Sequence, residues 1–540
     1  MKIKALTLFL FGALIACSKE EKADMLIINA NVYTVDTSMT KATAFAIVEG
    51  RFAAIGEDEE LQKRFTADTV IDMEGATIVP GLIDAHCHFY GLGLNQQQVD
   101  LTGTNSFDEV LSRVDQFAKE KQPTMIIGRG WDQNDWEEKE FPVKDQLDVL
   151  YPDTPVILER IDGHAYLVNQ KVLDLAGIDA TTKVPGGEVV LVDDKPSGVL
   201  VDRPMELVEK IIPDFDVATK IRALQDAQEI SFGYGLTTVN DAGISREIIE
   251  LIDSLQKAGE LDIRIYAMVS NNKEDVAYFL DKGVVKTDHL DVRSVKVYGD
   301  GALGSRGAAL KAPYSDKHGH FGAMVTPVAD IEALAIKIAD SDYQMNTHAI
   351  GDSANVVILR AYDKALQGQQ DRRWKIEHAQ VIDPADFHYF SENIVPSVQP
   401  THATSDMYWA EDRLGPDRMK GAYAYKQLLE ESGRVALGTD FPVEQVNPFL
   451  TFYAAVVRKD VKGYPEGGFQ MEDALTREET LRGMTIWAAW SNFEEEEKGS
   501  IESGKLADFT VLDRDIMTVE ETEIPETKVK ATYVGGKRVF

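Results

Sequence analysis

The chain begins and ends in short runs of apolar and β-branched residues, whereas its middle alternates such runs with longer amphipathic segments. The runs near the two ends lie at residues 25–28, 44–48, 69–71, 508–512 and 531–534. Asparagine and glycine residues interrupt them, as is typical of turns between strands. Both ends of the chain are therefore predicted to form β-structure.

The middle of the chain predicts alternating strands and helices. One amphipathic segment, residues 248–252, is followed by Gly259, which is well placed to end a helix. Alternation of this kind favours a parallel sheet, and eight units of it close into a (β/α)8 barrel of the α/β class. The expected barrel strands are the run containing His86 and residues 237–240, 263–269, 292–298, 344–348, 374–378, 394–398 and 434–439.

Residues 101–230 do not follow this alternation and are predicted to be an α/β insertion after the first barrel strand. Ser106 and Glu109 form a capping-box pattern for a helix through Lys119. Two strands and a second helix, which returns to the barrel, are expected at residues 125–128, 156–158 and 216–232.

The first 17 residues have the features of an export signal. Lys2 and Lys4 precede an apolar run, residues 6–15, that is too short to span a bilayer. Residues 14–17, Leu-Ile-Ala-Cys, resemble a bacterial lipobox in which Cys17 is acylated; a secretory signal cut nearby is the alternative. The expected location is the bacterial cell envelope, with a lipid anchor and the protein on the periplasmic or surface face.

Length and charge restrict the class of protein. A chain of 540 residues is too long to fold around one simple hydrophobic core, which suggests two or three structural units. Its net charge of -34 argues against a nucleic-acid partner, which would favour a basic surface. The two cysteines, Cys17 and Cys87, provide no disulfide framework.

Candidate chemistry begins at His86 and His88. Residues two apart in a strand project to the same side, so both imidazoles would meet at the end of the first barrel strand. Two neutral imidazoles suit a transition metal. A histidine pair at a strand edge without a ligand role is the alternative.

Four more polar residues stand within or at the ends of later predicted strands, where barrel enzymes keep their chemistry: Lys296, His348, His378 and Asp440. A lysine inside an apolar strand is costly unless its charge is changed or paired. Taken singly, a buried salt bridge, hydrogen-bonded core histidines and a helix cap would also explain them.

Together these residues resemble the metal motifs of the amidohydrolase superfamily, beginning with Pro-Gly-Leu-Ile-Asp-Ala-His-Cys-His at residues 80–88. The insertion, with Gly-Trp-Asp at 130–132 and Asp-Gly-His at 162–164, is similar to that of the YtcJ-like subgroup, related to N-substituted formamide deformylases. Residues 504–508 look like that family's start to the C-terminal half. The resemblance covers nearly all of residues 24–540.

The resemblance implies that the two chain ends form one small β-sandwich beside the barrel. The implied division of the chain is a signal peptide and tether (1–23), the N-terminal part of the sandwich (24–79), barrel strand 1 with its metal motif (80–100), the insertion (101–230), the hydrolase barrel (231–484), and the last helix with the C-terminal part of the sandwich (485–540).

The resemblance also implies hydrolysis of a C–N bond in an amide or an N-formyl or N-acyl amine, a small-molecule substrate. One divalent ion would be held by His86, His88 and Asp440. A second would be held by His348 and His378, with Lys296, carboxylated by carbon dioxide, as the bridge. Asp440 would move the proton from water to the leaving nitrogen. Zinc is the expected metal, because imidazole and carboxylate suit it; iron, manganese or a single ion are alternatives.

Several alternatives stay open at this point. Trp131, His164, Asp300 and His320 are candidate substrate contacts. A place in the core explains Trp131 as well, a surface position or support of a neighbouring site residue explains His164, and a solvated loop explains His320. Within the enzyme class, a deaminase or a cyclic-amide hydrolase is the alternative. Outside it, a lipid-anchored binding protein on a retained barrel is the alternative. A homodimer is a compatible assembly.

Replacement of Cys17 tests the anchor. We expect Cys17→Ala to release the protein from the membrane fraction or to stall its processing, because no thiol remains to be acylated. Cell fractionation and N-terminal sequencing measure both effects, and Cys87→Ala serves as the matched control. Wild-type protein found wholly in the cytoplasm with an intact N-terminus would contradict the prediction.

Overall fold

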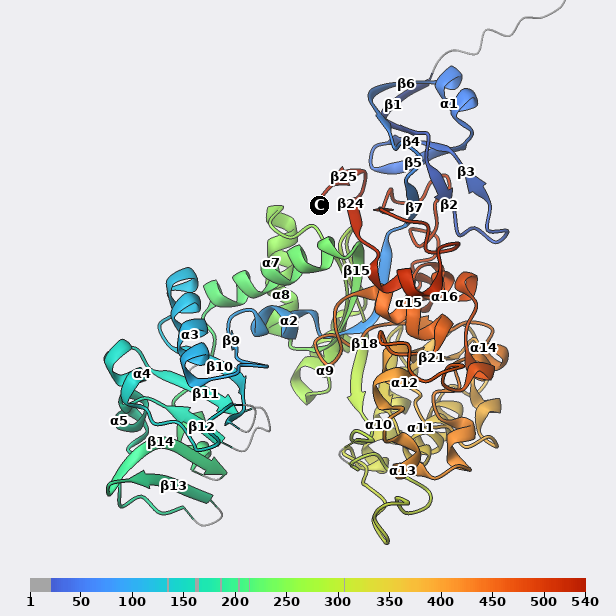
Figure 1. The fold of residues 1–540 in the computed structure, drawn as a ribbon. Coiled ribbons are helices and arrows are strands. Elements are labelled where there is room, and N and C mark those ends of the chain that lie inside the picture. Colours follow the sequence, from blue (N-terminus) through green and yellow to red (C-terminus); the bar gives the residue numbers. More distant parts are fainter. Residues whose placement is uncertain are drawn as a thin grey trace, which may run out of the picture.

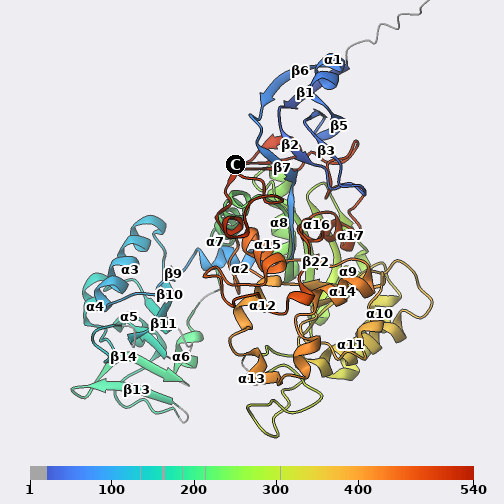
Figure 2. The same cartoon turned by 45° about the vertical axis from the view of Figure 1, so that its right-hand side comes forward.

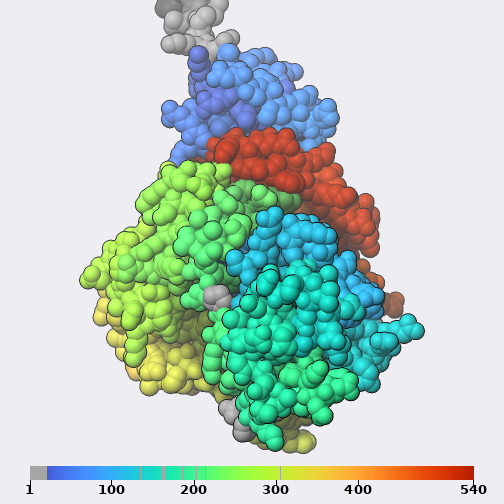
Figure 3. Space-filling view, turned by 90° about the vertical axis from the view of Figure 1, so that its left-hand side faces the viewer, coloured from blue at the N-terminus to red at the C-terminus, as the bar shows by residue number. Residues whose placement is uncertain are grey.

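The computed structural model describes residues 21–133, 136–160, 165–184, 187–202, 204–212, 214–304 and 306–540. Figures 1 and 2 show a β-sandwich at the top, a barrel below it and the insertion at the side of the barrel. In Figure 3 the red C-terminal segment lies between the blue N-terminal strands and the rest of the molecule.

The two chain ends share the β-sandwich. Strand β7 (Thr77–Pro80) lies between β2 (Asn31–Tyr33) and β23 (Phe509–Leu512) and runs antiparallel to β23. The rings of Phe45 and Phe509 pack edge to face, with centroids 5.0 Å apart, between the two sheets. The expected joint domain is confirmed. Its other elements are β1 (Glu21–Ile28), β3 (Lys41–Ala42), β4 (Ala44–Val48), β5 (Arg51–Gly56), α1 (Asp58–Arg64), β6 (Phe65–Asp72), β24 (Val529–Val534) and β25 (Lys537–Arg538).

The barrel is nearly closed by eight parallel strands within the described residues, which confirms the expected TIM-type fold. Apolar side chains of each strand alternate outward, where they pack against the surrounding helices. In order around the barrel the strands are β8 (Leu82–Cys87), β15 (Leu236–Ile244), β16 (Arg264–Ser270), β18 (Leu290–Tyr298), β19 (Gln344–Ala349), β20 (Trp374–His378), β21 (Ile394–Val398) and β22 (Ala436–Leu437).

Helices cover the outside of the barrel, as the amphipathic segments predict. Helix α8 (Arg246–Ala258) begins at Ser245, whose hydroxyl accepts from Ile248 N, and ends before Gly259 at a φ of +72°. The other main helices are α2 (Phe89–Asn95), α7 (Val217–Gly233), α9 (Lys273–Lys282), α10 (Val328–Ala339), α11 (Asp352–Ala365), α12 (Pro400–Asp406), α13 (Ala410–Leu414), α14 (Tyr425–Ser432), α15 (Pro448–Val457), α16 (Arg477–Gly483) and α17 (Ile486–Ser491).

The first and last barrel strands meet through hydrogen bonds beyond the short β22. Asp440 N donates to His86 O (2.8 Å), and His88 N donates to Phe441 O (2.7 Å). The backbone N–H and the hydroxyl of Thr439 donate to the buried carboxylate of Asp84, at 3.0 and 2.7 Å. The candidate residues His86, His88 and Asp440 are thus joined by the barrel closure itself.

The insertion is a separate sheet of six strands within the described residues, in the order β13-β14-β12-β11-β10-β9. Ser106 accepts from Glu109 N as predicted, but the Glu109 carboxylate accepts from Asn105 N, one residue before the position that a capping box requires. The elements are β9 (Val99–Asp100), α3 (Phe107–Lys121), β10 (Ile126–Trp131), α4 (Asp145–Leu150), β11 (Val156–Arg160), β12 (Ala165–Val168), α5 (Gln170–Ala176), β13 (Gly187–Val192), β14 (Lys195–Asp202) and α6 (Met205–Glu209).

Helix α7 connects the insertion to the barrel and packs on α2 (Figure 1). Gly93 of α2 approaches Ala223 of α7 so closely that a Cβ would lie 1.9 Å from the Ala223 carbonyl oxygen. Only glycine permits this approach. The contact holds the chain against the barrel directly after the first metal-motif strand.

The described part of the chain contains no helix that combines the length and the apolar character needed to cross a membrane. Residues 1–20, among them Cys17, lie outside the described residues. The lipid anchor therefore stays a prediction.

One buried ion pair ties the barrel to the sandwich. Arg264, the first residue of β16, donates from Nε and Nη2 to the two carboxylate oxygens of Asp508, at 2.7 and 3.0 Å. The Asp508 carboxylate also accepts from Gly535 N (2.7 Å). Both charged side chains are almost completely buried. Removal of one partner would leave the other charge desolvated and unpaired.

We expect Asp508→Ala to lower the free energy of unfolding by about 3–5 kcal/mol, the usual cost of breaking a buried pair from one side. Urea denaturation followed by circular dichroism measures the change. Glu59→Ala, which removes the exposed partner of Lys63, is the matched control and should have little effect. Equal unfolding midpoints for the two variants would contradict the prediction.

Candidate active site

A cavity of about 370 Å³ lies at the carboxyl ends of the barrel strands. Its polar lining includes His88, His348, His378, His402, Lys296 and Asp440. Its apolar lining includes Tyr298, Leu303, Ile350, Trp409 and Val443. The candidate ligands from strands far apart in the sequence therefore converge at the position where barrel enzymes hold their chemistry.

His86, His88 and Asp440 form one group of possible metal donors. The Nε2 atoms of His86 and His88 lie 3.6 and 3.3 Å from Asp440 Oδ1. That oxygen is buried and has no hydrogen-bond partner. An unpartnered buried carboxylate oxygen facing two imidazoles fits a divalent cation, which would satisfy all three donors.

In His86, His88 and His378, the ring nitrogen Nδ1 donates a hydrogen bond to an acceptor. His86 Nδ1 donates to Glu377 Oε2 (2.6 Å), His88 Nδ1 to Ala242 O (3.1 Å) and His378 Nδ1 to Gln399 Oε1 (2.7 Å). These bonds select the tautomer whose Nε2 lone pair is free. Such support is characteristic of histidines that bind metals.

A second donor group consists of His378, His402 and Asp440. His402 Nε2 lies 3.6 Å from Asp440 Oδ2, the oxygen that does not face His86 and His88. The sequence analysis missed His402. It stands four residues after β21, and its place directly beyond a predicted barrel strand was the signal that could have identified it.

His348 lies beside His378, with ring centroids 4.5 Å apart, but belongs to neither donor group. Its Nε2 is buried, 3.6 Å from Asp300 Oδ1, and has no hydrogen-bond partner. The predicted pair of His348 and His378 is thus brought together, while the structure adds His402 on the other side of His378.

Lys296 projects into the barrel because strand alternation sends Val295 and Val297 outward into the hydrophobic core. Its Nζ lies 3.2 Å from His86 Nε2. Among the described residues, no carboxylate oxygen lies within ion-pair distance of this Nζ. Burial lowers the pKa of Lys296, so the neutral amine is favoured over the ammonium.

Burial likewise lowers the pKa of His86, of His378 and, to about 3, of His348. Neutral imidazoles are the form that binds metals. Burial alone would raise the pKa of Glu377, but His86, Lys296 and Lys375 outweigh it and hold the pKa to about 2. Burial therefore favours neutral nitrogen donors at the site, and the Glu377 carboxylate beside them is favoured in its charged form.

Two of the strand-end residues have left-handed backbone conformations. The φ angles are +75° at His378 and +63° at Asp440. Such conformations are unfavourable for residues other than glycine and cluster at functional sites. They turn each side chain from the end of its strand toward the cavity.

The structure places three of the proposed substrate contacts outside the lining of the cavity. Trp131 is fully buried in the core of the insertion, and its indole N–H donates to Leu158 O (2.8 Å). His320 packs on Tyr314 and pairs with Arg306 O. Neither lines the cavity, because packing within their own segments holds them elsewhere.

Asp300 is a structural residue of the loop after β18. Its carboxylate accepts hydrogen bonds from the backbone N–H groups of Ala309, Ile350 and Gly351, at 2.8, 3.0 and 2.9 Å. It therefore supports the cavity wall from behind. His164, the fourth proposed contact, lies outside the described residues.

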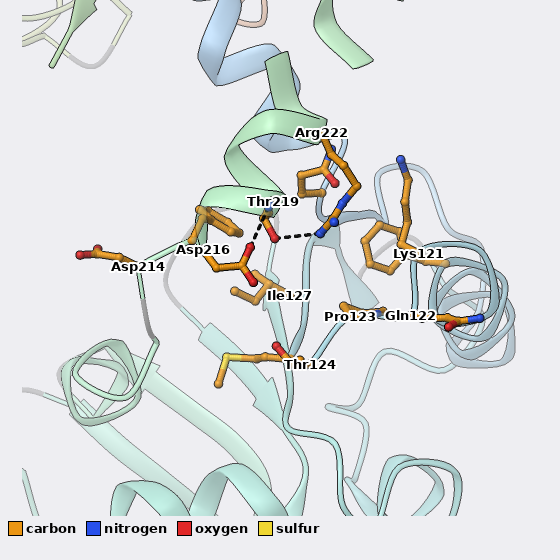
Figure 4. A pocket seen from close by; sticks show the side chains of 13 residues that line it. Lys121, Gln122, Pro123, Thr124, Ile127, Asp214, Asp216, Thr219 and Arg222 are labelled. Carbon is orange, nitrogen blue, oxygen red and sulfur yellow. Dashed lines mark hydrogen bonds between the residues drawn. The ribbon is translucent and has the colours of Figure 1, made fainter. Parts of the chain in front are cut away.

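A second cavity, of about 410 Å³, lies where the insertion meets α7 (Figure 4). Here Asp216 accepts from Thr219 N (2.7 Å), and Arg222 donates to Thr219 Oγ1 (2.9 Å). Lys121 pairs with Asp226 (2.8 Å). Helix capping and surface pairing explain these groups, and no histidine is among the described residues that line it. The barrel cavity, which is lined by histidines, is therefore the candidate active site.

The barrel and its histidine–aspartate donor groups define a metal-dependent hydrolase of the barrel type. The chain belongs to the amidohydrolase family, whose sequence model matches residues 69–540. It is 31% identical to YtcJ of Bacillus subtilis (strain 168), itself named as an amidohydrolase, over 94% of this chain and 98% of that protein.

Two further comparisons agree with this assignment. The chain is 27% identical to the N-substituted formamide deformylase of Arthrobacter pascens, over 95% of this chain and 97% of that enzyme. The structure resembles a metal-dependent hydrolase from Pyrococcus horikoshii OT3, with a TM-score of 0.77 and 26% identity over 92% of this chain and 99% of the other.

Glu377 offers a test of the metal centre. In Glu377→Gln the acceptor of the His86 Nδ1 proton loses its charge, so we expect metal affinity to fall by roughly 10–100-fold. Competition with a chromophoric chelator measures the affinity. Glu392→Gln, an exposed partner of Arg434, is the control. Unchanged affinity in Glu377→Gln would show that the carboxylate does not support a ligand.

Proposed function

We propose that the protein hydrolyses the C–N bond of an N-acyl or N-formyl amine with a metal-activated water. The observation that carries the proposal is the group of His86, His88 and Asp440, with an unpartnered carboxylate oxygen and anchored imidazoles, in a cavity at the strand ends. The likeness to a formamide deformylase over nearly the whole chain supports this bond type.

His86, His88 and Asp440 would hold one divalent ion, and His348 and His378 would hold a second. Zinc is the metal that we propose, because neutral imidazole and carboxylate ligands suit it. When bound, the metal supplies Lewis-acid polarisation and a water with a lowered pKa. The buried, neutral histidines of this chain are arranged to receive it without losing a proton.

We also propose that Lys296 carries a carbamate formed with carbon dioxide. A neutral amine is the form that reacts with carbon dioxide, and burial without a carboxylate partner favours that form here. Lys296 Nζ lies 3.2 Å from His86 Nε2, so a carboxylate formed on Nζ would stand beside the imidazoles. The carbamate would return a negative charge to a site crowded with neutral donors.

Asp440 is proposed to carry the proton. Although burial raises the pKa of its carboxyl, the neighbouring His88, His86 and His402 together outweigh burial and lower it, so the carboxylate is charged and able to accept a proton. The backbone bond to His86 O fixes its place. It takes the proton from the attacking water and passes it to the leaving nitrogen.

Turnover by metal-replete protein tests the proposal. We expect hydrolysis of at least one member of a panel of N-formyl amines, N-acyl amines and small cyclic amides, and its loss after chelation. Asp440→Asn retains shape but cannot shuttle a proton, so kcat should fall by roughly 10²–10⁴-fold at equal metal occupancy. Ser391→Ala, in a surface turn, is the control.

Two outcomes would contradict this proposal. Protein that binds no transition metal under any reconstitution would exclude the metal-dependent reaction. Metal-loaded wild-type protein that turns over no C–N substrate, while binding members of the panel, would favour the binding protein on a retained barrel. Equal kcat values for wild type and Asp440→Asn would remove the proton role from Asp440.

A further inference from the structure

His402 differs from the other imidazoles of the cavity in how it is held. It lies in the first turn of α12, its side chain is 13% exposed, and it lines the cavity. Its ring stacks on that of His378, with centroids 5.9 Å apart and an interplanar angle of 21°. The ring is thus placed at the wall of the cavity, beside the donors.

The ring nitrogens of His402 have no hydrogen-bond partner among the described residues. By contrast, the Nδ1 atoms of His86, His88 and His378 are each anchored by an acceptor. Histidines that bind metals almost always have such an anchor. His402 is therefore not built as a ligand, although its Nε2 stands close to the metal-binding residues.

The carboxylate of Asp440 stands beside Nε2 and bears on the tautomer of the ring, and Asp406, four residues further along the chain, is a second charged group near His402. Asp440 Oδ2 lies 3.6 Å away, too far for a hydrogen bond but close enough for its charge to favour a proton on Nε2. His402 then presents an N–H donor to the cavity. A donor without a partner, at the wall of a reaction cavity, can bind an atom of the substrate.

The position of α12 shows which side chains lie near the Nε2 donor of His402 in the cavity. The chain continues from α12 to Trp409, whose ring also lines the cavity. A Cβ at Gly304 would lie 3.2 Å from this ring, so the loop after β18 and Trp409 pack closely. His402, Trp409 and Asp440 line the same cavity, so a substrate that fills it can reach His402 Nε2.

We propose that His402 is a catalytic residue that donates a hydrogen bond from Nε2 to the carbonyl oxygen of the substrate and to the oxyanion that forms there. This rests on the proposed hydrolysis of a C–N bond. No proton is transferred from His402; the bond strengthens as negative charge develops on the oxygen. Loss of one such donor reduces kcat by roughly 10²–10³-fold.

The experiment uses cobalt-loaded full-length protein as wild type, His402→Ala, His402→Gln and His388→Ala. His388 is an exposed histidine and is the matched control. Metal per chain and the visible spectrum of bound cobalt test for a ligand role. Inorganic phosphate, a tetrahedral oxyanion, is titrated against that spectrum. Where a substrate is hydrolysed, kcat and KM are measured separately.

We expect metal content and the phosphate-free spectrum to be unchanged in both His402 variants. Phosphate affinity should fall about 10-fold in His402→Ala, since an N–H to a charged acceptor contributes roughly 1.5–3 kcal/mol. The amide of His402→Gln should restore part of it. For a hydrolysed substrate, kcat should fall much more than KM rises.

Loss of metal or a changed cobalt spectrum in the His402 variants would make His402 a ligand and overturn the proposal. Unchanged phosphate affinity in His402→Ala would overturn it as well. The phosphate titration does not require a substrate. A wild-type protein that hydrolyses nothing would therefore count only against the proposed hydrolysis. If His402→Ala does not fold, His402→Gln decides by the same measurements.

Discussion

The hydrogen bonds that close the barrel are the constraint on which the site depends. Asp440 N bonds to His86 O, and the Asp84 carboxylate binds Thr439 from the other side. The first strand supplies the histidine pair and the last supplies the carboxylate. Because the same bonds join the strands and place the side chains, the donors are positioned before any metal binds.

Buried charge is the second feature that unites the structure. Glu377 supports His86, while Lys375, two residues earlier on the same strand, donates to Asn492 Oδ1 (2.6 Å). Asn492 in turn donates to Asn240 Oδ1 (2.9 Å), deep in the barrel. These hydrogen bonds give partners to the charged side chains of Lys375 and Glu377 inside the barrel, which lowers the cost of burying them. The hydrogen bond between Glu377 and His86 reaches the site at the strand ends.

Much of the site could be predicted from the sequence, because side chains in a strand alternate with a period of two. The position of Lys296 among outward-facing valines follows from that rule, as does that of His86 on β8, with His88 directly after the strand. The eight strands and the joint sandwich are confirmed by the structure. That rule does not say which side chains reach the cavity: Trp131, at the end of β10, and His320, in a loop, are each held within their own segment, outside the cavity lining.

The sequence by itself determined the order of strands and the residues at their ends, since periodicity and local turn chemistry are properties of neighbouring positions. Only the tertiary structure decided which side chains meet. It paired Glu377 with His86 across the barrel, turned Asp300 toward backbone amides and brought His402 to Asp440. These contacts join residues far apart in the chain, so they depend on barrel closure and helix packing, which no local pattern encodes.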